Sequence, residues 1–133
     1  MIIYVFGNED HSQDSLGITV SQKLTKDFPE IDFHVLPPNS DIPINQEKTV
    51  NIIDAADGIS EVTLITEKNL NKIVISPRST LHDYDLSFQL KYLIKIGRLK
   101  NFNIVGLPLL GKVDYDLIHS IFKKLVAQDM QGS

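Results

Sequence analysis

The stretch that decides the fold lies at residues 2–7 and reads IIYVFG. Its first five residues are apolar, with β-branched and aromatic side chains, and Gly7 ends the run. A short, continuous apolar run of this kind is typical of a strand that is buried on both faces, as strands of parallel sheets are. We therefore expect a strand at residues 2–6 of a parallel sheet, followed by a polar loop.

Outward from this run, strand patterns alternate with helix patterns. Apolar residues at four-residue intervals predict a first helix from Leu16 to Phe28, which Pro29 ends. A second helix is expected over residues 86–94, closed by Gly97, and a third over residues 117–126. Short apolar runs predict the remaining strands, at residues 31–35, 50–54, 62–65, 73–75 and 102–106.

This alternation indicates the fold class. Strands that alternate with helices form right-handed βαβ units, which build a mostly parallel sheet. We therefore predict an α/β protein, a single three-layer domain whose twisted, mostly parallel sheet carries helices on both faces. With 133 residues, the chain is expected to form one domain over residues 1–133. The stretch at residues 37–47 is rich in proline and polar residues, and we interpret it as a long loop.

Composition excludes several classes of function. The formal net charge is -4 and no block of lysine and arginine stands out, which argues against nucleic acid as a partner. The chain has no cysteine, so disulfides, thiolate metal sites and cysteine nucleophiles are excluded. No stretch approaches the ~20 apolar residues that span a membrane, and the N-terminal run is too short for a secretory signal. We expect a cytoplasmic protein without a membrane partner, and the sequence predicts no particular oligomeric state.

Three residues fall where an open α/β sheet binds its ligands, beyond the carboxyl ends of the strands. Asp14 lies in the loop after the first strand, Asp54 ends the strand predicted at 50–54, and His82 precedes the second helix. Two carboxylates and an imidazole suit divalent transition metals such as zinc, nickel, manganese or iron. The same three groups could instead serve as a general base, an electrostatic partner and a proton shuttle.

Each of the three also has a structural interpretation. Asp14 could cap the first helix, because aspartate is a favoured N-cap. Asp54 could begin a turn, although an aspartate directly after a buried strand costs free energy unless it has a partner. His82 could be an exposed loop residue, and His34 and His119 fit structural positions better than a site. No glycine-rich nucleotide motif and no nucleophile-elbow motif is present, so we expect no organic cofactor.

Four motifs, in chain order, resemble those of the hydrogenase maturation endopeptidases. The correspondence runs from residue 1 to about residue 127. The four motifs are Gly7-Asn8 with Asp14 and Gly17, Ile52-Ile53-Asp54-Ala55 with Asp57-Gly58, Leu81-His82 before an amphipathic helix, and Val105-Gly106-Leu107-Pro108. Two departures stand out. Gln13 replaces the first acid of the family's acidic pair, and residues 36–40 (LPPNS) stand where the family has a glycine-rich stretch and then a helix.

The resemblance implies a function. Members of this family are hydrolases that remove a C-terminal peptide from the large-subunit precursor of a [NiFe] hydrogenase after nickel has been inserted. By resemblance, Asp14, Asp54 and His82 would be both the metal-binding and the catalytic residues, and the divalent metal would be nickel presented by the substrate. The altered stretch at 36–40 keeps open a non-peptidase relative that binds metal or a metalloprotein without cleavage. A flavodoxin-like domain that binds a small ligand is a further alternative.

Overall fold

The computed structural model describes residues 1–7, 15–37, 40–43, 49–56, 59–68, 89–109 and 112–131. Five strands form one sheet in the order β2-β1-β3-β5-β4. Their bounds are β1 Ile2–Phe6, β2 Asp32–Leu36, β3 Thr49–Ala56, β4 Thr63–Thr66 and β5 Asn101–Pro108. Strand β1 runs parallel to β2 and β3, and β3 runs parallel to β5, whereas β4 is antiparallel to β5. The prediction of a mostly parallel sheet is confirmed.

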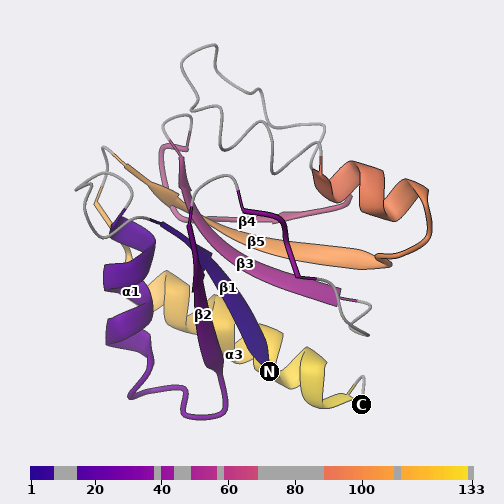
Figure 1. Ribbon diagram of the computed structural model, residues 1–133. Coiled ribbons are helices and arrows are strands. Elements are labelled where there is room, and N and C mark those ends of the chain that lie inside the picture. The colour runs from indigo at the N-terminus through magenta and orange to yellow at the C-terminus, as the bar shows by residue number, and fades with distance from the viewer. Residues whose placement is uncertain are drawn as a thin grey trace.

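Helices cover both faces of this sheet, as predicted (Figure 1). Helices α1 (Leu16–Leu24) and α3 (Tyr115–Gln131) pack against one face, where their apolar residues join those of β1, β3 and β5 in one cluster. The helix of residues 89–95 packs against the other face and contributes Leu90 to a second cluster. The result is the expected three-layer α/β arrangement. Among the described residues, no helix is long and apolar enough to cross a membrane.

Strand β1 shows why its sequence is a continuous apolar run. Ile3 and Val5 belong to the cluster beneath α1 and α3, while Tyr4 and Phe6 belong to the cluster on the opposite face. Successive side chains of a strand point to opposite faces, so a strand covered on both sides needs apolar residues at every position. Burying each large apolar side chain contributes roughly 1.5–3 kcal/mol, which makes β1 a main contributor to the core.

Helix α1 is shorter than its apolar spacing predicts, because it ends at Leu24 and not at Phe28. Pro29 disfavours the helical conformation of the residue before it. The chain instead forms a turn, in which the N–H groups of Asp27 and Phe28 both donate to the carbonyl oxygen of Leu24 at 3.1 and 3.0 Å. Phe28 is nevertheless buried against Phe122 of α3. The apolar spacing therefore identifies a core residue correctly but places it in the wrong element.

Strands β3 and β5 each extend two residues beyond their predicted ends. Their register continues from Asp54↔Gly106 to Ala56↔Pro108. Pro108 has no N–H group to donate to a further rung, which accounts for the end of the ladder there. Asp54 consequently lies two residues inside β3 and does not end it, which corrects the prediction. The strand expected at residues 73–75 lies outside the described residues.

The end of the second helix agrees with its sequence. Gly97 adopts φ 78°, a left-handed conformation that glycine tolerates best. The N–H of Arg98 donates to the carbonyl oxygen of Leu93 at 3.0 Å, and the N–H of Gly97 donates to that of Ile94 at 3.1 Å. These two bonds are the Schellman arrangement, which satisfies the last carbonyl groups of a helix. The predicted closure of this helix by Gly97 is confirmed.

Candidate active site

Asp54 is a buried carboxylate near the carboxyl end of the central strand. The residue is only 6% exposed to solvent. Its register partner in β5 is Gly106. Because alternate residues of a strand share a face, Asp54 lies on the same face as Val50 and Ile52, which the helix of residues 89–95 covers. Asp54 thus lies near the carboxyl end of the central strand, and its predicted role in a site stays a prediction.

Ile59 covers the position beside Asp54. A Cβ atom placed on Gly106 would lie 2.5 Å from Cδ1 of Ile59 and 3.4 Å from Cδ1 of Ile65. The isoleucine from the β3–β4 connection thus occupies the volume that a side chain at position 106 would need. Asp54 is therefore paired with a position of β5 that has no side chain and that Ile59 covers.

The start of α1 lies at the same edge of the sheet (Figure 1). A Cβ atom on Gly17 would lie 3.2 Å from Cγ1 of Val5, 3.4 Å from the carbonyl oxygen of Phe6 and 3.6 Å from Cγ2 of Ile53. Glycine at this position lets the first turn of the helix approach the end of β1 and the residue that precedes Asp54. Ser15 holds the N-cap position, one residue later than the capping alternative for Asp14 placed it.

The other two predicted site residues, Asp14 and His82, lie outside the described residues. Their convergence with Asp54 therefore stays a prediction. Within the ranges that the structure describes, no group of three histidine, aspartate or glutamate side chains is arranged to hold a metal ion.

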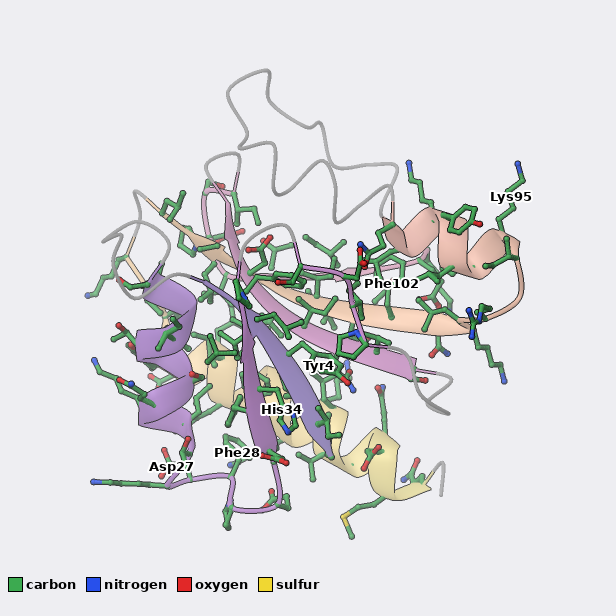
Figure 2. The ribbon with its side chains drawn as sticks, in the orientation of Figure 1. Tyr4, Asp27, Phe28, His34, Lys95 and Phe102 are labelled. Carbon is green, nitrogen blue, oxygen red and sulfur yellow. The ribbon has the colours of Figure 1, made fainter. Side chains whose placement is uncertain are left out.

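The two described histidines are both on the surface. Nε2 of His34 lies 2.8 Å from Oδ2 of Asp32, and Nε2 of His119 lies 3.0 Å from Oδ2 of Asp27. The His34 ring also meets the ring of Tyr4 edge-on, with centroids 6.0 Å apart (Figure 2). Both histidines have the structural positions that their sequence context favoured.

Residues 40–43 lie in the region where the sequence departs from the family pattern, and they form no helix. The side chain of Ile42 is buried, and its backbone N–H donates to Oε1 of Gln89 at 2.7 Å. The hydroxyl of Tyr4 donates to the carbonyl oxygen of Pro43 at 3.1 Å. This segment therefore connects β1 to the helix of residues 89–95. A tyrosine in a buried apolar run is the sequence signal for such a contact, because its hydroxyl needs a partner.

No family model matches this chain, and no curated protein matches it. Among the solved structures that are similar to it are two endopeptidases. The hydrogenase maturating endopeptidase HybD from Escherichia coli superposes with a TM-score of 0.58 and 14% identity, covering 99% of this chain and 93% of that one. The solution structure of an endopeptidase from Escherichia coli superposes with a TM-score of 0.57 and 15% identity, covering 96% of this chain and 89% of that one. The predicted resemblance is thus confirmed at the level of structure: nearly end to end, this chain has the fold of a hydrogenase maturation endopeptidase.

Proposed function

We propose that this protein is an endopeptidase that removes the C-terminal extension of a nickel-loaded [NiFe] hydrogenase large subunit. The observation that carries the proposal is the placement of Asp54. It is a buried carboxylate at the ligand-binding edge of the sheet, in the central strand, within the fold of a hydrogenase maturation endopeptidase. The carboxyl ends of the strands are where open α/β sheets bind their ligands, so a carboxylate in this position favours a chemical role.

In this proposal, Asp54 binds the substrate's nickel together with Asp14 and His82. Carboxylate oxygen and imidazole nitrogen are suitable ligands for nickel. The beginning of α1 supports the participation of Asp14, because Ser15 starts the helix at this edge and Asp14 directly precedes it in the sequence. Three protein ligands leave coordination positions for groups of the substrate, so only a precursor that has received its metal would be held correctly.

The reaction is hydrolysis of one peptide bond. A water molecule attacks the scissile carbonyl carbon, its proton passes to a carboxylate acting as general base, the C–N bond breaks, and the leaving amine takes up the proton. The substrate's metal would polarise the carbonyl oxygen as a Lewis acid.

A cleavage assay tests this function. Nickel-loaded large-subunit precursor is incubated with the protein, and mass spectrometry follows the loss of the C-terminal peptide. We expect truncation by the wild type and none by Asp14→Ala, Asp54→Ala or His82→Ala, each checked for folding by circular dichroism. Nickel-free precursor should stay intact. Precursor that remains whole with wild-type protein, under conditions where a maturation endopeptidase cuts it, would contradict the proposal.

A second candidate function is binding of a metal or a metalloprotein without cleavage. The packing of residues 40–43 favours it, because that segment is held against the core by Ile42 and Pro43 where the family has a glycine-rich stretch and a helix. Isothermal titration with nickel distinguishes the two. Stoichiometric nickel binding that Asp54→Ala abolishes, together with an uncut precursor, would support the binding function.

A further inference from the structure

The helix of residues 89–95 and the turn after it carry a concentrated positive charge. Lys91, Lys95, Arg98 and Lys100 are all exposed, and no acidic residue occurs between positions 89 and 100. None of these four cations has an ion pair with the part of the chain that the structure describes. This positive segment belongs to a chain whose formal net charge is -4, so the remainder is more acidic than the whole.

Two large apolar side chains lie among these cations. Tyr92 is 54% exposed and Ile96 is 46% exposed. Residues four apart on a helix are neighbours, so Lys91 and Lys95 form one row and Tyr92 and Ile96 form the adjacent row. The opposite side of the helix packs against the core, where Leu90 is 0% exposed. Figure 2 shows the Lys95 side chain extending away from the sheet.

The backbone beneath these side chains is held firmly. The helix is anchored by Leu90, and the chain after the Gly97 turn is anchored by Leu99, which is 3% exposed. The N–H groups of Arg98 and Leu99 both donate to the carbonyl oxygen of Leu93, at 3.0 and 3.2 Å. A surface whose backbone is already ordered loses less entropy when it binds, and this favours a role in recognition.

We propose that four residues on the exposed face of this helix, Lys91, Tyr92, Lys95 and Ile96, form a docking surface for an acidic region of a partner protein. We call them the basic helix surface. Its row of cations and the adjacent apolar row are complementary to a protein surface on which a row of carboxylates lies beside an apolar row. Tyrosine is enriched at such interfaces, and desolvated apolar side chains at the centre supply much of their binding energy.

Other anionic partners fit this surface less well. A nucleic-acid duplex would be repelled by the net negative charge of the chain, and the apolar row adds nothing to phosphate contacts. A membrane-surface helix buries its apolar face in lipid, whereas this helix buries Leu90 in its own protein core. A protein partner uses both the cations and the exposed apolar row.

A peptide titration tests the proposal without any cleavage step, so its outcome is independent of the proposed function. The probe is a synthetic helical peptide of about 15 residues, long enough to form a helix, with a leucine row beside a row of glutamates. It is added to the isotope-labelled full chain, and amide chemical shifts are followed by nuclear magnetic resonance. We expect binding with the largest shifts at residues 91–96, and an affinity that falls as salt is added.

Matched variants locate the surface. We expect Lys91→Glu with Lys95→Glu to weaken binding at least about tenfold, and Tyr92→Ser with Ile96→Ser to weaken it comparably. Lys123→Glu with Lys124→Glu makes the same charge change on exposed residues of α3 and should leave the affinity unchanged. The proposal is overturned by the absence of peptide binding or by an equal loss in the α3 variant. It is also overturned if an all-glutamate peptide binds as well, or if duplex DNA or phosphatidylserine vesicles bind more tightly.

Discussion

The two ends of strands β3 and β5 carry buried polar side chains with different surroundings. At the amino ends, Nδ2 of Asn103 donates to Oδ1 of Asn51 at 2.9 Å, and the hydroxyl of Thr49 donates to the side-chain oxygen of Asn101. Near the carboxyl ends, Asp54 has Gly106 as its register partner, and Gly106 has no side chain. Asn51 and Asp54 are almost equally buried, at 7% and 6% exposed.

The comparison teaches that burial of a polar residue does not by itself indicate a functional site. Asn51 and Asn103 form a cross-strand pair that satisfies part of their hydrogen-bonding capacity within the sheet, which is a structural role. Opposite Asp54, strand β5 offers no side chain, and Ile59 fills the volume above Gly106. The two ends of these strands therefore differ in what β5 places opposite the buried residue of β3, a side chain at Asn51 and none at Asp54.

The largest effect is expected for Asp54→Ala. Loss of this carboxylate removes a metal ligand or the general base, so cleavage of the precursor should fall by about 10²–10⁴-fold while the far-ultraviolet circular dichroism is retained. Asn51→Ala, in the same strand and almost equally buried, is the control and should cleave at nearly the wild-type rate at a temperature where it is folded. Equal losses of activity in both variants would contradict a specific catalytic role for the carboxyl end of β3.

A smaller effect, on stability, is expected for Gly106→Val. The added branched side chain meets Cδ1 of Ile59, which must move, and overpacking of this kind should lower the free energy of unfolding by about 3 kcal/mol. The measurement is the midpoint of urea unfolding. The double variant Gly106→Val with Ile59→Ala makes room for the valine and should recover part of the loss. If the double variant is less stable than Gly106→Val alone, Ile59 is not the residue that requires glycine at position 106.

Which of these features could be predicted from the sequence depends on how local their causes are. The strand at residues 2–6 and the helix end at Gly97 were predictable, because burial on both faces and a left-handed cap each leave a signal within a few residues. That Asp54 follows the apolar run of its strand was visible in the sequence, but the two further residues of β3 beyond it were not.

Features that depend on strand register were not predictable. The Asn51–Asn103 pair and the contact of Ile59 with the position of Gly106 join residues that are distant in the sequence, so no local sequence pattern predicts them. The end of α1 was missed because Phe28 keeps the helical spacing although it lies in a turn, where it still reaches the core. Asp14 and His82 lie outside the described residues, so their predicted place at the site awaits the cleavage assay.

Asn51→Ala should reduce stability by about 1.5 kcal/mol, because Asn103 loses its acceptor in a partly buried position. Urea unfolding with an unchanged slope would report this as a shift of the midpoint. The double variant Asn51→Ala with Asn103→Ala should lose less than the sum of the two single variants, since neither amide is then left without its partner. Strict additivity would show that the pair contributes no interaction free energy, and the structural interpretation of the amino ends would fail.

The smallest effect is expected for Thr49→Val, which removes the side-chain hydrogen bond from Thr49 to Asn101 at the amino ends of β3 and β5. Thr49 is exposed, so water can replace its hydroxyl as a partner for Asn101, and valine keeps both the shape and the strand preference of threonine. The free energy of unfolding should change by no more than about 0.5 kcal/mol. If Thr49→Val lowers the free energy of unfolding as much as Asn51→Ala does, burial does not determine how much these side-chain hydrogen bonds contribute to stability.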